Sequence, residues 1–141
     1  MRIQTRLSIC VIFLISVVLI LAGCETKKMT LNYADGSGNL YIVVSHPKPH
    51  LSYQPVQAAT SSSGLYSGGE PVERDLSHED LKALSDKVQA ALNNPTVHIK
   101  ERVKMSGALE LRSDDRTVSI ILQPACTEQI ELENLLKQLR S

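Results

Sequence analysis

The chain has 141 residues, of which 43% are hydrophobic and 21% are charged, and its 15 basic residues balance its 15 acidic residues. A chain of this length accommodates one domain with its own core. The absence of a net positive charge argues against a protein that binds nucleic acid along a basic face.

The N-terminal residues have the pattern of a secretory signal. Arg2 and Arg6 make a short basic region, and the apolar run 7–20 that follows is interrupted only by two serines. A basic end followed by an apolar middle is typical of an exported protein. The run is short for a membrane-spanning helix, which needs ~20 residues.

The apolar run closes on Leu21-Ala22-Gly23-Cys24, which resembles the lipobox of bacterial lipoproteins. The resemblance covers residues 1–24. It implies that Cys24 receives diacylglycerol, that residues 1–23 are removed, and that the new amino group is acylated. Two or three acyl chains make a stable anchor, since each buried CH₂ contributes ~0.8 kcal/mol. The alternative is an uncleaved N-terminal anchor helix.

The resemblance also implies that the residue after the lipobox cysteine influences whether a lipoprotein is sorted to the inner or the outer membrane. The resemblance implies that Asp at this position often retains the protein in the inner membrane of a double-membrane bacterium. This chain has Glu25 instead, which favours the periplasmic leaflet of the outer membrane. In a single-membrane bacterium the anchor would lie on the outer face of the plasma membrane. Residues 24–28 comprise the lipidated cysteine and a short polar tether.

Removal of residues 1–23 changes the charge and cysteine content of the remaining chain. Two of the 15 basic residues are lost, so 13 basic residues stand against 15 acidic residues and the net charge is −2. With Cys24 joined to lipid, Cys126 is the one cysteine left with a free thiol. The sequence therefore predicts a fold without an intrachain disulfide, and we expect no cofactor.

The first half of the mature chain has the pattern of β-structure. Residues 29–33 alternate apolar and polar side chains, and residues 40–44 form an apolar run beyond a turn at 35–39. Together they predict a hairpin. Residues 51–56 indicate a third strand at a sheet edge, because Pro55 cannot donate to a ladder.

Residues 57–75 are expected to form a long irregular stretch that is rich in Ser and Gly between residues 60 and 70. Structureless loops longer than ~12–15 residues are usually functional or disordered. Leu65 and Tyr66 form an apolar pair in the middle of this stretch. The pair indicates that the loop is pinned to the core or that it offers an aromatic anchor to a partner. A flexible connector without such a role is the competing interpretation.

Two amphipathic helices are predicted. Ser77 and Asp80 form a capping box that begins the first helix, and Asn93-Asn94-Pro95 ends it. The second helix begins near Thr127, with acidic residues in its first turn and basic residues in its last. The apolar stripes consist of Leu81, Leu84, Val88 and Leu92 in the first helix and of Leu132, Leu135, Leu136 and Leu139 in the second.

Between the helices, alternating residues predict three further strands over 97–105, 109–112 and 117–123. A two-residue turn at Asp114-Asp115 and a three-residue loop at 106–108 keep the apolar side chains on one face, which a slip of one residue would not do. The predicted pairs are Leu111 with Val118, Leu109 with Ile120, Met105 with Leu109, and Val103 with Leu111.

The fold class is α+β, with a single small domain over residues 29–141 and the element order βββ-α-βββ-α. A largely antiparallel sheet is expected to have both helices packed on one face. The other face is then open and carries a group of basic residues from the last strands: Lys100, Arg102, Lys104 and Arg112. This group suits an acidic protein, anionic lipid headgroups or an anionic envelope polymer. An ordinary solvated sheet face is the competing interpretation.

Three further features have weaker candidate roles. Cys126 precedes the second helix, whose dipole can activate a thiol, although a small buried apolar residue is the simpler interpretation. His46 and His50 are two imidazoles, fewer than the three or four ligands that zinc needs. Glu101 interrupts the apolar alternation, which indicates a bulge or a position outside helix cover.

The sequence contains no GxSxG or HExxH motif and no paired His/Cys metal spacing. We therefore expect a non-enzymatic, membrane-anchored envelope lipoprotein that binds an envelope protein or polymer rather than nucleic acid. The alternative is a small inhibitor-like or ligand-binding lipoprotein that uses residues 60–70. An enzyme is a third alternative, since catalytic triads are defined by geometry and not by sequence order.

Overall fold

A computed structural model of the chain describes residues 28–141. The leader 1–23, Cys24 and residues 25–27 of the tether lie outside the described residues. The elements of the described part are, in chain order, β1 (Met29–Ala34), β2 (Leu40–Val44), β3 (His50–Gln54), η1 (Ala58–Thr60), β4 (Val72–Asp75), α2 (His78–Asn93), η2 (Pro95–Val97), β5 (His98–Ile99), β6 (Gly107–Ser113), β7 (Thr117–Leu122) and α3 (Thr127–Arg140).

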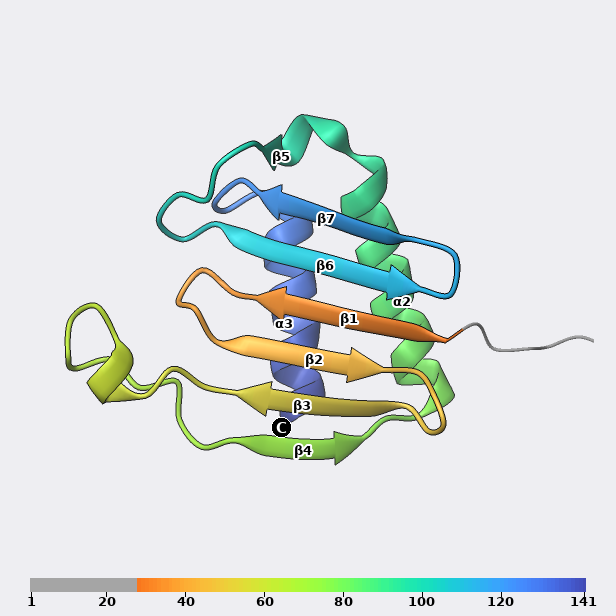
Figure 1. Ribbon diagram of the computed structural model, residues 1–141, viewed down its shortest axis with the longest axis horizontal. Coiled ribbons are helices and arrows are strands. Elements are labelled where there is room, and N and C mark those ends of the chain that lie inside the picture. Colours follow the sequence, from red (N-terminus) through yellow and green to blue (C-terminus); the bar gives the residue numbers. More distant parts are fainter. Residues whose placement is uncertain (1–27) are drawn as a thin grey trace, which may run out of the picture.

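The strands of residues 28–141 form one seven-stranded sheet in the order β4-β3-β2-β1-β6-β7-β5. Every neighbouring pair is antiparallel. Figure 1 shows the sheet in front of α2 and α3, so both helices cover one face and leave the other open. The α+β class and its layers are confirmed, with four strands rather than three before α2.

The predicted register of the last hairpin is confirmed. Leu109 pairs with Ile120 and Leu111 pairs with Val118. Ser113 and Arg116 close the two-residue turn, and the Ser113 amide donates to the Arg116 carbonyl at 2.8 Å. This register places Leu109 and Leu111 of β6 and Ile120 of β7 against the core on the face that the helices cover.

The core lies between the covered sheet face and the two helices. Three tyrosines, Tyr33, Tyr41 and Tyr53, are among the most deeply buried side chains, and Leu84 and Leu132 meet them from α2 and α3. Truncation of a leucine buried in this way to alanine costs about 2–5 kcal/mol of folding free energy. The predicted capping box of α2 is present, with the Ser77 hydroxyl accepting from the Asp80 amide at 3.0 Å.

The prediction that residues 57–75 are irregular throughout is wrong at its end, because Val72–Asp75 form β4. This strand pairs with β3, so β3 is not a sheet edge as predicted. Three of the four β4 residues are charged, which hides the strand from a hydrophobic pattern. Charged residues are well suited to an edge strand, because they discourage pairing with another chain.

The predicted strand over 97–105 is also wrong. Only His98–Ile99 is extended, and it pairs with β7 rather than with β6. A turn takes its place: the Ser106 hydroxyl accepts from the Val103 amide at 3.1 Å and donates to the Val103 carbonyl. Such local side-chain bonds compete with a strand ladder. The predicted pairings of Met105 with Leu109 and of Val103 with Leu111 therefore do not form.

Candidate interaction end

Three loops meet at one end of the sheet: residues 35–39, 55–71 and 100–106. We call them together the loop end. In Figure 1 they lie on the left, whereas β1 begins at the right-hand end of the sheet. The loops are far apart in sequence, so their proximity is a property of the fold.

Direct contacts join the three loops. The Asn39 side-chain amide donates to the Tyr66 hydroxyl at 2.9 Å, and Arg102 Nη2 donates to the Asp35 carbonyl at 3.0 Å. Gly36 lies against the Met105 backbone so closely that a Cβ at residue 36 would be 2.7 Å from the Met105 carbonyl oxygen. The loop end is therefore one connected surface.

A buried Asp–Asn pair organises this surface. The Asp35 carboxylate accepts from the Asn39 backbone amide at 2.9 Å and from the Asn39 side-chain amide at 2.8 Å. The Asn39 side-chain oxygen in turn accepts from the Val56 amide at 3.0 Å. Asp35 and Asn39 are 5% and 4% exposed, so each of these bonds satisfies a group that water does not reach.

Hydrogen bonds, rather than burial of the apolar pair Leu65 and Tyr66 in the core, hold the long loop against the rest of the domain. Besides the bond to Tyr66, the Tyr53 hydroxyl donates to the Gly68 carbonyl at 2.8 Å, and the Gly68 amide donates to the Val56 carbonyl at 2.9 Å. Tyr66 is 38% exposed, whereas Leu65 is 87% exposed. The loop therefore holds Tyr66 in place and presents Leu65 to solvent.

The loop of residues 100–106 presents two more apolar side chains, Val103 and Met105, which are 51% and 52% exposed. Met105 has a φ of 65°, a left-handed conformation that costs a non-glycine residue about 1–2 kcal/mol. The Gln129 side-chain amide fixes this conformation by donating to the Met105 carbonyl at 2.9 Å. Backbone strain of this kind is held in place by its surroundings and is common at functional sites.

A small pocket of about 230 Å³ opens between these loops and α3. Gly36, Tyr66 and Met105 line it from the loops, and Lys137 and Arg140 line it from the helix. The Arg140 guanidinium lies 4.2 Å from the centre of the Tyr53 ring, a cation–π contact. The pocket thus combines aromatic and cationic groups next to the exposed apolar side chains.

The four basic residues predicted to share one sheet face are not brought together there. Arg112 is on β6 and pairs with Glu110 at 2.7 Å. Arg102 and Lys104 lie in the loop after β5, and Lys100 lines a groove on the open sheet face. The cause is the turn at Val103–Ser106, which ends the predicted strand. Three of the four residues, Lys100, Arg102 and Lys104, belong instead to the loop 100–106 of the loop end.

Sequence reasoning missed Val103 and Met105 as surface residues, because their alternation with charged residues indicated a strand with an apolar face. Ser106 and Gly107 immediately after them are a usable signal for a turn. Glu101 is exposed, and Cys126 is a free and buried residue at the N-cap of α3.

His50 pairs with two carboxylates across β3 and β4. Its Nδ1 lies 3.0 Å from Asp75, and its Nε2 lies 2.7 Å from Glu73. These hydrogen bonds, first to Asp75 and then to Glu73, raise the pKa of the His50 imidazole above its usual value. Ser52 donates to Glu73 at 2.6 Å and lowers the pKa of that carboxyl. These side-chain hydrogen bonds join the edge strand β4 to β3 in addition to the backbone pairing.

Within residues 28–141, no group of three or more His, Cys, Asp or Glu side chains is arranged to hold a metal ion. The same residues include no helix that is both long and apolar enough to cross a membrane. No protein-family model matches the chain, and neither a curated protein nor a solved structure shows significant similarity to it.

Proposed function

We propose that this chain is a lipid-anchored protein of a bacterial cell envelope that binds a partner protein through its loop end. The lipobox-like motif supports the anchor, which would be attached to Cys24. In a double-membrane bacterium, Glu25 favours attachment to the periplasmic leaflet of the outer membrane. The role is non-enzymatic, and an anionic envelope polymer is the other kind of partner that the basic residues suit.

The observation that carries this proposal is that the chain enters β1 at one end of the sheet and the loop end lies at the other. The described chain starts at Lys28 and enters the sheet at Met29, whereas β1 finishes beside the loop end at Ala34. Six strand residues span about 20 Å. A domain tethered by residues 24–28 therefore presents the loop end on the side of the sheet opposite the tether.

Exposed apolar surface at the loop end favours a protein partner. Of the five large hydrophobic residues that are exposed in residues 28–141, all but Ile130 belong to this end: Leu65, Tyr66, Val103 and Met105. Clustered exposed apolar residues are typical of interaction sites, and a tyrosine held in place is a frequent anchor. Arg102 and Lys104 flank Val103 in the loop 100–106 and suit an acidic rim on the partner.

The anchor is tested by the intact mass of protein purified from its native membranes, compared with a Cys24→Ala variant. We expect the wild-type chain to lack residues 1–23 and to carry diacylglyceryl and acyl groups, and the variant to keep its leader. Fractionation of both proteins locates them. An intact and unmodified leader on the wild-type chain would overturn the lipoprotein assignment.

The binding role is tested with a photo-crosslinking amino acid at Leu65 of the full chain, in its native envelope. The matched control carries the same amino acid at Ala90, an exposed position of α2. We expect a discrete protein adduct from position 65 and none from position 90. Met105→Asp should lower the adduct yield about fivefold or more, because it places a charge in an apolar contact. Equal adducts from both positions would contradict a specific site.

A second candidate function, a protease inhibitor, is favoured by one observation. Leu65 is 87% exposed on a loop that its own hydrogen bonds hold, including the Ser61 hydroxyl to the Ala58 carbonyl at 3.0 Å. A fixed loop with leucine at its tip resembles a substrate for a protease with an apolar specificity pocket. Chymotrypsin provides the discriminating assay. A binding protein leaves its activity unchanged, whereas an inhibitor blocks it and stays uncut.

A further inference from the structure

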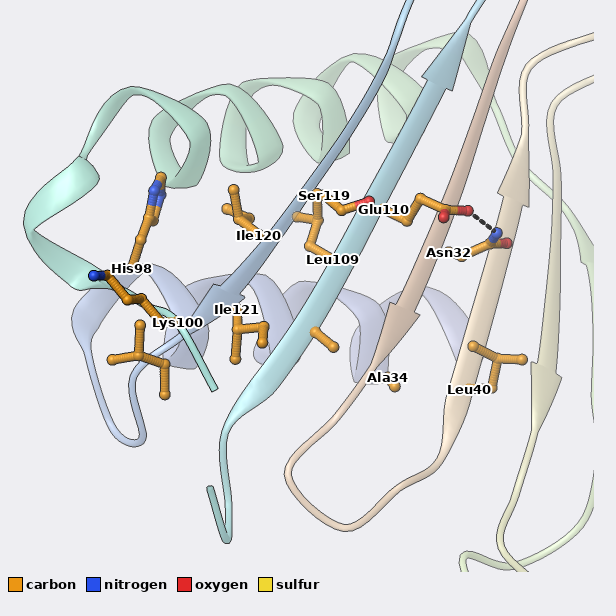
Figure 2. A pocket seen from close by; sticks show the side chains of 12 residues that line it. Asn32, Ala34, Leu40, His98, Lys100, Leu109, Glu110, Ser119, Ile120 and Ile121 are labelled. Atoms are coloured by element: carbon orange, nitrogen blue, oxygen red, sulfur yellow. Dashed lines mark hydrogen bonds between the residues drawn. The ribbon is translucent and has the colours of Figure 1, made fainter. Parts of the chain in front are cut away.

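The open face of the sheet contains a groove of about 610 Å³ at its loop-end margin. One row of side chains crosses four neighbouring strands there, since Leu40 pairs with Ala34, Ala34 with Ala108, and Ala108 with Ile121. Figure 2 shows Ala34, Leu40 and Ile121 lining the groove. The floor therefore consists of two alanines, and larger apolar side chains form the two walls.

The dimensions of this groove fit an α-helix. Leu40 on β2 and Ile121 on β7 are three strand spacings apart, or about 14 Å. A helix with its side chains measures about 10–12 Å across. Ile99 pairs with Ile121 and extends the second wall by one strand. An extended acyl chain is much narrower and would leave most of the floor uncovered.

The charges around the groove indicate which side chains the helix carries. Glu110 is already neutralised, since it accepts from the Asn32 side-chain amide at 3.1 Å and pairs with Arg112 at 2.7 Å. Lys100 also lines the groove, and its ammonium has no ion pair or hydrogen bond within the described part of the chain. The unmatched charge at the rim is therefore positive.

We propose that this groove receives an amphipathic α-helix of the partner protein. The apolar stripe of the helix lies over Ala34 and Ala108 between the two walls, and an acidic residue of the helix faces Lys100. This inference rests on the proposed binding function and names the part of the partner that is bound. It also assigns to Lys100 a role distinct from that of Arg102 and Lys104.

The test uses photo-crosslinking amino acids placed singly at Ala34 and at Ala108 of the full chain in its native envelope, with the adducts sequenced by mass spectrometry. We expect both positions to capture residues three or four apart in one partner segment, with an acidic residue nearby, because that spacing defines a helix face. Adducts with an extended segment, with lipid or with a second copy of this chain would overturn the proposal.

Two variants test the groove itself. With the crosslinker at Ala108, Ala34→Trp fills the floor and should lower the yield about tenfold or more. Lys100→Glu should lower it about fivefold, whereas the charge-matched control Lys82→Glu, at an exposed position of α2 on the other side of the sheet, should leave it within about twofold. Lys100 is exposed, so its reversal spares the fold. Equal effects of the two reversals would contradict a specific acidic contact at Lys100.

The crosslink from Leu65 separates failure of this inference from failure of the binding function. An adduct from position 65 together with none from positions 34 and 108 would overturn the groove proposal and leave the binding function standing. No adduct from any of the three positions would overturn both proposals.

Discussion

The Asn39 side chain donates one hydrogen bond to the Tyr66 hydroxyl at 2.9 Å and another to the Asp35 carboxylate at 2.8 Å. Its oxygen accepts from the Val56 amide. One buried amide therefore ties the end of the first hairpin to both sides of the long loop. The position of Leu65 at the tip of that loop depends on this amide.

Tyr66→Phe and Asn39→Ala are expected to differ in their effects. Tyr66→Phe removes a single hydrogen bond and should lower the free energy of unfolding by about 0.5–1.5 kcal/mol. Asn39→Ala removes the partner of the Asp35 Oδ2 oxygen and of the Val56 amide, and should lower it by about 2–3 kcal/mol. Denaturant unfolding measures both. Hydrogen exchange should quicken in residues 61–68 for both variants. Equal stability losses would contradict the central position of Asn39.

The buried tyrosines predict a loss of stability at alkaline pH. Burial, with the nearby Glu133 carboxylate as the next cause, raises the pKa of Tyr33 far above its usual value, and burial also raises the pKa of Tyr41. Above about pH 10 the unfolded chain loses these protons and the folded chain keeps them, so unfolding becomes easier as the pH rises. Each tyrosine contributes a slope of up to about 1.4 kcal/mol per pH unit.

Tyr33→Phe is the check on this assignment. The variant loses the bond from the Tyr33 hydroxyl to Glu133 at 3.0 Å and should be less stable at neutral pH. Between pH 10 and pH 11, however, its free energy of unfolding should fall less steeply with pH than that of the wild-type chain. The difference corresponds to about one proton fewer released on unfolding. Denaturant titrations at several pH values measure this slope. Parallel curves for the two proteins would show that Tyr33 ionises freely.

The His50 cluster predicts a pH-dependent edge strand. Since the pKa of His50 is raised in the folded chain, its contribution is complete below the unfolded value of about 6.5 and is lost as the pH rises through the folded pKa. The pKa values of Glu73 and Asp75 are lowered, so their contribution is lost as the pH falls below about 4. Attachment of β4 should be strongest between these limits.

Hydrogen exchange in β4 at pH 5.5 and pH 8.5 measures this effect, after correction for the intrinsic dependence of exchange on pH. Protection of Val72–Asp75 should be greater at the lower pH in the wild-type chain and should change little in His50→Gln. Protection of β6 in the centre of the sheet serves as the internal control. A His50→Gln variant with the same pH dependence as the wild-type chain would rule out His50 as the cause.

Met105→Gly should stabilise the fold and weaken binding. Glycine adopts a φ of 65° without strain, although its greater freedom in the unfolded chain offsets part of the gain, so we expect a net stabilisation of about 0.5–1 kcal/mol. The crosslink from Leu65 should weaken, because an exposed apolar side chain is lost. Ala125→Gly, at a φ of 60°, is the matched control and should stabilise without affecting the crosslink. Destabilisation by Met105→Gly would contradict the strain.

Much of the fold follows from local patterns in the sequence. The capping box at Ser77 and Asp80, the stripe of Leu132, Leu136 and Leu139, and the pairing of Leu109 with Ile120 across a two-residue turn are each determined within a few residues. Helix caps, helix periodicity and hairpin register are short-range properties, so a single sequence is sufficient to predict them.

Only tertiary contacts determine that β4 forms an edge strand, that β5 is short and that the three loops of the loop end lie together. Val72–Asp75 becomes a strand because β3 offers it a free edge, and Val103 becomes exposed because Ser106 closes a turn against its backbone. The loops that carry Tyr66 and Arg102 lie at the same end of the sheet because Asn39 and Asp35, in the turn of the first hairpin, bond to one loop each. The sequence by itself determined the helices, the hairpins and the lipobox-like motif, since these depend on neighbouring residues. The interaction surface depends on contacts between residues dozens of positions apart, and only the folded chain sets these.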